Sequence, residues 1–140
     1  MAVRIRLRLR RGNLIKEVVG LVNSGYEADT PQLLVPVGLA KELKLWPPGE
    51  NAIEAVFETA GGPLRVWIIR RAVMVKAVAE DASSDEVEAD IVVSHLADEP
   101  LISDRLAGAL KIAVEDFAEG LWRFRWEPKD KLRRSEARTA

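Results

Sequence analysis

An alternating segment near the start of the chain narrows the possible folds more than any other feature. Residues 3–10 place Val, Ile or Leu at the odd positions and arginine at the even positions. Successive side chains of a β-strand point to opposite faces, so this period of two predicts a strand with one buried and one solvated face. A turn is expected at 11–13, and the apolar stretch 14–22 favours a return strand that enters the core. The chain therefore opens with a β-hairpin.

Beyond this hairpin, short apolar segments are separated by turn residues. Strands are expected at 33–36, 52–59, 64–78, 87–94, 111–116 and 121–126, and 64–78 is either one long strand or two consecutive ones. Two short helices are expected, at 37–45 and at about 104–110, the second with Asp104 as its N-cap. Frequent short strands with few helical residues indicate an all-β domain, either a closed barrel or a sandwich.

Length and composition are those of one globular domain. The chain has 140 residues, and its hydrophobic fraction of 48% is high enough to form a core. We assign residues 1–127 to the domain. Residues 128–140 are charged and lack periodicity, so they are expected to form a flexible tail. The acidic turn at 80–86 is expected to be mobile as well.

Several classes of function are disfavoured by what the sequence lacks. There is no cysteine, which excludes disulfides, zinc-thiolate sites and cysteine nucleophiles. His95 is the sole histidine, which argues against a multi-histidine metal site and against a Ser-His-Asp triad within one subunit. The net charge of −1 gives no drive toward nucleic acid. No apolar run approaches the roughly 20 residues of a membrane helix, and no signal peptide is apparent, so a cytoplasmic location is expected.

Amide side chains are scarce in a sequence that is rich in arginine and glutamate. Asparagine occurs at positions 13, 23 and 51, and glutamine at position 32. This bias favours a thermophilic source, because such proteins avoid thermolabile amides. The arginine row of 4–10 is interpreted as the solvated face of an edge strand. Tryptophans on expected strands are interpreted as core or dimer contacts, namely Trp67, Trp122 and Trp126.

Four segments, 20–25, 34–45, 58–62 and 98–106, follow one another in a characteristic order. With this order over about 3–126, the chain resembles the retropepsin-like aspartic-protease family, in its archaeal or thermophile-type single-domain form. Residues 20–25, Gly-Leu-Val-Asn-Ser-Gly, resemble the catalytic stretch, which usually reads apolar-apolar-Asp-Thr/Ser-Gly. Residues 34–45 resemble the Leu-Pro strand and helix that follow it. Residues 58–62 are similar to the turn of the flap hairpin, and 98–106 to the late Leu-Leu-Gly turn and helix.

This resemblance implies a closed acid-protease barrel with one or two short helices that works as a homodimer. It implies peptide or protein as substrate, and neither a cofactor nor a metal. The residues it marks as catalytic are Asn23, Ser24 and Gly25, and those it marks as the substrate-binding flap turn are Ala60, Gly61 and Gly62. The sequence departs from the family at two positions, because Asn23 replaces the catalytic Asp and Ser103 replaces the usual Gly.

The replacement of the catalytic Asp by Asn23 affects the reaction that the family catalyses. Family members pair two aspartates that share a proton, so that one activates water and the other protonates the peptide. An asparagine amide has no proton that titrates near working pH. The protein is therefore expected to be a pseudoenzyme that binds extended peptides without cutting them, with Ser24 bracing the dimer.

Other interpretations remain open. Asp29 is a substitute acid that would make the protein an active endopeptidase, although Pro31 fits poorly where the family has a flexible glycine. Deamidation of Asn23 would restore a carboxylate after synthesis. Asn23 is also open to interpretation as a turn amide that caps backbone groups. The protein would then be a structural dimer or an assembly subunit without enzymatic activity.

Overall fold

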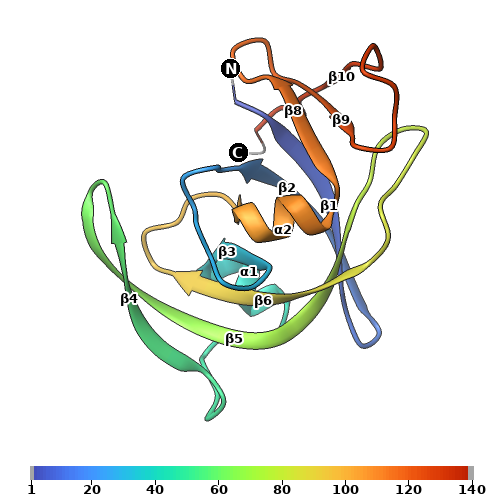
Figure 1. The fold of residues 1–140 in the computed structure, drawn as a ribbon. Helices are drawn as coiled ribbons and strands as arrows, with labels where there is room; N and C mark the ends of the chain where they lie inside the picture. The colour runs from blue at the N-terminus through green and yellow to red at the C-terminus, as the bar shows by residue number, and fades with distance from the viewer. Residues whose placement is uncertain (1, 139–140) are drawn as a thin grey trace.

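The structure, a computed structural model, describes residues 2–138 and is made mainly of β-strands (Figure 1). The strands are β1 (Arg4–Arg11), β2 (Leu14–Val22), β3 (Gln32–Pro36), β4 (Ile53–Thr59), β5 (Gly62–Ala77), β6 (Val87–Ser94), β7 (Leu101–Ile102), β8 (Ile112–Asp116), β9 (Leu121–Phe124) and β10 (Arg133–Arg134). Two helices of six residues accompany them, α1 (Val37–Glu42) and α2 (Asp104–Ala109). The predicted all-β class is confirmed. No helix in this part of the protein is long and apolar enough to cross a membrane.

Seven strands form one sheet that closes on itself. Their order is β1-β2-β7-β3-β6-β5-β4, and β1 also pairs with β5, from Leu7 opposite Ala77 to Arg10 opposite Met74. This pairing closes the ring and leaves β4 outside it, as one arm of a hairpin that extends from the ring (Figure 1). A smaller sheet of order β10-β9-β8 completes the fold.

The opening alternation has the predicted effect on burial. Ile5, Leu7 and Leu9 are fully buried in the core, and the arginines between them face outward. The prediction that β1 is an edge strand is wrong, because it pairs with β2 on one side and β5 on the other. Each outward arginine instead forms an ion pair with a glutamate: Arg4 with Glu99, Arg6 with Glu17 and Glu136, Arg8 with Glu17, and Arg10 with Glu86.

Segment 64–78 proves to be one strand rather than two, because β5 covers it as far as Ala77, and this strand serves two parts of the fold. Its first part pairs with β4, from Gly62 to Ile68, and its last part pairs with β1. Between them the register with β6 shifts between Ile69 and Val73, and Arg71 adopts a φ of 50°. A bulge of this kind bends a strand and increases its twist. The bend lets β5 leave the ring and support the hairpin.

Both helices differ in detail from the sequence-based expectation. Helix α1 ends at Glu42 rather than Leu45, because Lys44 takes a φ of 60° and the following Leu45 N–H donates back to the carbonyl of Ala40. Helix α2 is capped by Ser103 rather than Asp104. The Ser103 hydroxyl accepts a hydrogen bond from the Leu106 N–H at 3.1 Å.

The last segment differs from the expected flexible tail as far as residue 138. Strand β10 pairs with β9, the Glu136 N–H donates to the Arg4 carbonyl at 2.8 Å, and the Arg4 N–H donates to the Ser135 hydroxyl at 2.8 Å. The turn at 80–86 is attached as well, since Ser84 exchanges hydrogen bonds with Ala77. Long-range polar contacts therefore fix segments that have no apolar periodicity. Residues 139–140 of the expected tail lie outside the described residues.

Candidate functional site

The turn Asn23-Ser24-Gly25 begins where β2 ends. The Asn23 N–H donates to the Ile102 carbonyl at 3.2 Å, and the Asn23 backbone carbonyl accepts from the Tyr26 N–H at 3.0 Å. The Oδ1 of the Asn23 side chain accepts from the Gly25 N–H at 3.0 Å. Ser24 and Gly25 are exposed and Asn23 is partly buried. The turn thus presents its small residues at the surface while its first residue is tied to the sheet.

Strand β7 holds this turn in place. It pairs in parallel with β2, with Leu21 opposite Leu101, and antiparallel with β3, with Leu34 opposite Leu101. Gly20 allows the close approach, because a Cβ there would lie 3.0 Å from Ile102 and 3.1 Å from Leu7. The structure therefore brings together two of the sequence-predicted segments, 20–25 and 98–106.

Ser103 has a structural role that the sequence alone did not reveal. Its hydroxyl is fully buried and accepts hydrogen bonds from the Gln32 N–H and the Leu106 N–H, both at 3.1 Å. Its own N–H donates to the Gln32 carbonyl at 3.1 Å. The neighbouring Asp104 N–H donates to the Tyr26 carbonyl at 2.9 Å. Ser103 therefore joins β3, the start of α2 and the loop after the Asn23 turn.

A series of polar side chains fixes the loop from 26 to 32. The Tyr26 hydroxyl donates to Gln32 Oε1 at 2.8 Å, Gln32 Nε2 donates to Thr30 Oγ1 at 3.2 Å, and Thr30 Oγ1 donates to Asp90 Oδ2 at 2.6 Å. The Arg71 N–H donates to the other Asp90 oxygen at 2.8 Å. Burial, with smaller contributions from the charges of Asp90 and Asp104, raises the pKa of Tyr26 above its ordinary value of 10.0.

This network was also missed by sequence reasoning, although two signals point to it. Asp90 directly precedes the apolar run Ile91-Val92-Val93 of an expected strand, and Gln32 is the sole glutamine of the sequence. A carboxylate inside an apolar strand needs partners, because a buried charge without hydrogen bonds is strongly destabilising.

The β4–β5 hairpin lies opposite the loop after the turn. The rings of Phe57 and Tyr26 have centroids 6.2 Å apart, and Figure 1 shows the hairpin curving around that side of the ring. One face of the hairpin contributes to a second apolar cluster, separate from the main core. Its members come from the hairpin, from the outer faces of β3 and β6, from β7, and from neighbouring loops: Tyr26, Leu34, Ala55, Phe57, Leu64, Val66, Ile68, Val92, Ala97 and Leu101.

The hairpin turn that the resemblance marks as the flap is the free end of this arm. Ala60 and Gly61 are exposed, and Thr59 Oγ1 accepts from the Gly61 N–H at 3.2 Å and donates to the Gly62 carbonyl at 2.7 Å. Gly62 has a φ of 108°, a conformation that residues other than glycine rarely adopt. The turn therefore depends on this glycine and on the Thr59 hydroxyl.

The remaining residues singled out from the sequence lie elsewhere. Asp29 is exposed in a bend, and it has no hydrogen bond or ion pair within residues 2–138. His95 is exposed and packs edge-on against Trp46 and Trp67, with ring centroids 5.3 Å apart in each case. Trp122 is buried as expected, but Trp126 lies beyond the end of β9, is exposed, and stacks on Phe124 at 4.4 Å.

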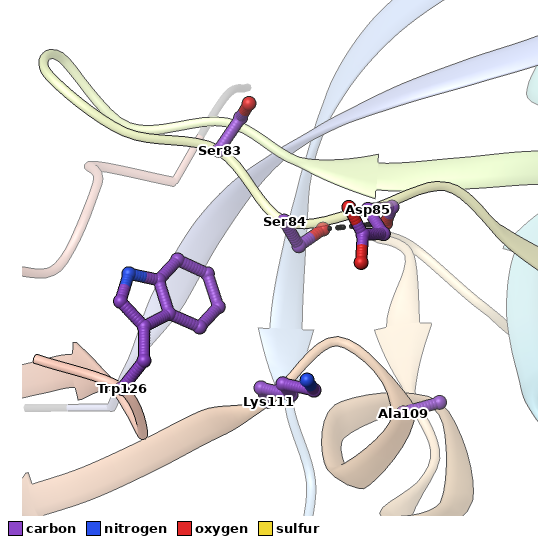
Figure 2. A pocket seen from close by; sticks show the side chains of 6 residues that line it. All are labelled: Ser83, Ser84, Asp85, Ala109, Lys111 and Trp126. Carbon is purple, nitrogen blue, oxygen red and sulfur yellow. Dashed lines mark hydrogen bonds between the residues drawn. The ribbon is translucent and has the colours of Figure 1, made fainter.

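Two surface hollows are separate from the Asn23 turn. Figure 2 shows the smaller, of about 310 Å³, between the segment 83–85 on one side and Ala109, Lys111 and Trp126 on the other. The larger, of about 700 Å³, is lined by Arg6, Trp122 and residues from 78–81 and 131–136. No group of three or more His, Asp or Glu side chains suited to a metal ion occurs between residues 2 and 138.

The chemistry open to this turn depends on the asparagine amide. Its Oδ1 is occupied by the Gly25 N–H, and its NH2 has no acceptor among the described residues. An amide can therefore donate and accept hydrogen bonds here but cannot take up or release a proton near neutral pH. Neither the protein-family models nor the curated proteins to which the sequence was compared give a match.

Proposed function

We propose that this protein is a retropepsin-like aspartic-protease homologue that binds extended peptides in a cleft between two copies and, with Asn23 in its turn, does not cut them. The observation that carries the proposal is the position of the Asn23 turn. It ends β2 of a closed sheet, is tied to β7 through Ile102, and faces a hairpin whose Phe57 contacts Tyr26. A turn, a late strand and a projecting hairpin in this arrangement are what the resemblance requires.

The loss of cleavage follows from the side chain at position 23. Hydrolysis by this class of enzyme uses one carboxylate as a base for water and another as an acid for the peptide nitrogen. Asn23 offers the same hydrogen-bond geometry, because its Oδ1 already accepts the Gly25 N–H as a carboxylate oxygen would. It lacks the titrating proton, so binding is retained while the reaction is lost.

A second copy is needed to complete the site, since each copy supplies one turn. Ser24 and Gly25 are exposed at the tip of the turn and can approach the same residues of a partner. The Ser24 hydroxyl has no hydrogen bond inside the described part of the protein, so it is free to bond across a two-fold axis. Analytical ultracentrifugation should give the mass of a dimer.

Peptide binding is supported by the free edge of β4. The order of the large sheet ends at β4, so the outer edge of this strand has unpaired backbone groups. Such an edge can take an extended peptide as an added strand, and nearby apolar pockets can then select its side chains. The second apolar cluster, which includes Phe57 and Leu101, lies on this side of the ring.

The test is peptide binding by the native protein and by two matched glycine variants. Gly62→Ala strains the hairpin turn, because Gly62 has a φ of 108°. Gly12→Ala also forces alanine into a positive φ, of 59°, in the β1–β2 turn, outside the proposed site. Fluorescence anisotropy with a library of extended peptides should show several-fold weaker binding for Gly62→Ala alone. A dimer that binds no peptide would instead support a structural role.

A further inference from the structure

We infer that Asn23 is a site of spontaneous deamidation, through which the protein turns its own amide at this position into a carboxylate. The effect of that carboxylate on peptide cleavage rests on the proposed function, but the deamidation does not. The sequence retains three asparagines in 140 residues, and of these Asn23 is the one whose Oδ1 accepts a backbone N–H within the described residues.

The reaction begins at the backbone nitrogen of Ser24. After this N–H loses its proton to water, the nitrogen attacks the amide carbon Cγ of Asn23 and the bond from Cγ to the amide nitrogen breaks. The departing amide nitrogen takes up a proton from water and leaves as ammonia, and a five-membered succinimide remains between Asn23 and Ser24. Water then opens the ring. If it cleaves the new bond from Cγ to the Ser24 nitrogen, the product is aspartate, and if it cleaves the original peptide bond, the product is isoaspartate. One water enters for each ammonia released.

Three features of the turn favour this reaction. The Gly25 N–H lies 3.0 Å from Asn23 Oδ1, where it stabilises the negative charge that develops on this oxygen during attack. The Ser24 N–H has no hydrogen-bond acceptor among residues 2–138, so its proton is accessible to water. Ser24 and Gly25 are exposed and small, which gives the turn room to form the ring without disturbing the core.

The other two asparagines are internal controls. Asn13 and Asn51 are exposed in turns, but in neither does Oδ1 accept a backbone N–H in the described structure. Asn51 is followed by Ala52, which is as small as Ser24, so the size of the next residue does not separate these two sites. What distinguishes Asn23 is the bond from Gly25.

An aspartate at position 23 fits the existing turn. A carboxylate oxygen accepts the Gly25 N–H as the amide oxygen does, and the backbone bonds of residue 23 to Ile102 and Tyr26 are unaffected by the exchange. Isoaspartate adds a carbon to the backbone between residues 23 and 24 and does not fit the turn. If the proposed function holds, only the aspartate product restores the acid of the site.

The experiment follows the mass of each asparagine peptide over time. The native, full-length protein is held folded at elevated temperature and at neutral to mildly alkaline pH, then digested and mapped by fragmentation mass spectrometry. Asn23 should lose its amide several-fold faster than Asn13 and Asn51, and the rate should rise with pH. Ser24→Val should slow the loss several-fold by crowding the attack, and Asn23→Gln should suppress it, because the ring would need an additional carbon.

Three results would overturn the inference: an intact amide at Asn23 while Asn13 or Asn51 react, equal rates at all three positions, or loss at Asn23 only after unfolding in urea. The mass measurement does not depend on peptidase activity. If native protein deamidates but Asn23→Asp cleaves no peptide, the proposed function fails and the deamidation stands. If Asn23→Asp cleaves but native Asn23 keeps its amide, the proposed function stands and the deamidation inference fails.

Discussion

The closed ring and the β4–β5 hairpin are made of the same kind of strand but are stabilised very differently. In the ring, Leu7 and Ile91 are fully buried in the main core. In the hairpin, Ile53 and Val56 are 45% and 62% exposed, and β4 has a partner on one side only. The ring therefore gains stability from burial on every strand, whereas the hairpin relies on one strand pairing and on a small second cluster.

This contrast indicates where the molecule can change shape. Segments with few buried apolar contacts open locally at low free energy, and binding elements are drawn from such segments. The hairpin can move against the ring while the Asn23 turn, tied through Ile102, stays with the ring. If a peptide binds between the two regions, the Asn23 turn would be the fixed side of the cleft and the hairpin would be the side that adjusts.

The largest expected contrast is between truncations in the two regions. Ile91→Ala should lower the free energy of unfolding by about 2–5 kcal/mol, because it leaves a cavity in a fully buried site. Val56→Ala should change it by no more than about 0.5 kcal/mol, since Val56 is exposed. Urea denaturation of both variants measures the contrast. Equal losses would mean that the hairpin belongs to the cooperative core.

A smaller contrast is expected between two glycines. Gly20→Ala should destabilise the ring by about 1–3 kcal/mol, because the new Cβ would lie 3.0 Å from Ile102. Gly38→Ala meets open space in α1 and should stabilise the protein by roughly 0.5–1 kcal/mol. Thermal unfolding followed by circular dichroism distinguishes the two. A neutral Gly20→Ala would show that β2 and β7 pack less tightly than described.

Ser103 lies where the ring meets the loop that faces the hairpin, and its loss should have an intermediate effect. Ser103→Ala removes the α2 cap and leaves the Gln32 N–H without its side-chain acceptor, at a cost of about 1–2 kcal/mol. Ser83→Ala is the control, because Ser83 is exposed, lies outside the proposed site, and its hydroxyl has no hydrogen-bond partner within residues 2–138. Chemical denaturation should show a lower free energy of unfolding for Ser103→Ala than for the control. Equal stability of the two variants would contradict the role of Ser103 in connecting β3, α2 and the loop after the Asn23 turn.

The smallest effect on stability is expected for Asp81, which lies away from the hairpin and whose contribution depends on pH. Hydrogen bonds from Lys131 and Arg133 lower the pKa of Asp81 from 3.8 to about 2. A carboxyl whose pKa is lower in the folded protein stabilises the fold above its unfolded pKa, and this contribution is lost as pH falls from 3.8 toward about 2. Wild type should therefore exceed Asp81→Asn in stability at neutral pH by a small margin, as measured by urea denaturation. That margin should narrow in acid and in high salt.

Sequence reasoning recovers the elements whose signal is local. Strands β2 and β6 have the expected bounds, because each is rich in Val, Ile or Leu and stops at turn residues. The all-β class follows from these runs. The N-cap of α2 was misassigned because Ser103 and Asp104 are adjacent and both suit the position, and geometry alone chooses between them.

What sequence reasoning misses depends on contacts between distant residues. The pairing of β1 with β5 makes β1 an internal strand, and nothing in residues 3–10 encodes it. The hydrogen bonds that attach residues 133–136 to Arg4 likewise correspond to no periodic pattern in the sequence. For the candidate site, the motif located the Asn23 turn and the hairpin turn, but the Tyr26-to-Asp90 network joins residues from separate segments and could not be assembled from the sequence.

The proposal that matters most is that the turn at Asn23 is the former catalytic position of an aspartic protease. Its decisive test compares freshly prepared native protein with Asn23→Asp on a mixed peptide library, from mildly acidic to neutral pH and at elevated temperature. Asn23→Asp should cleave and be blocked by pepstatin, and native protein should not cleave. Equal cleavage by both, abolished by Asp29→Asn, would contradict the proposal, as would a folded, dimeric Asn23→Asp that cleaves nothing.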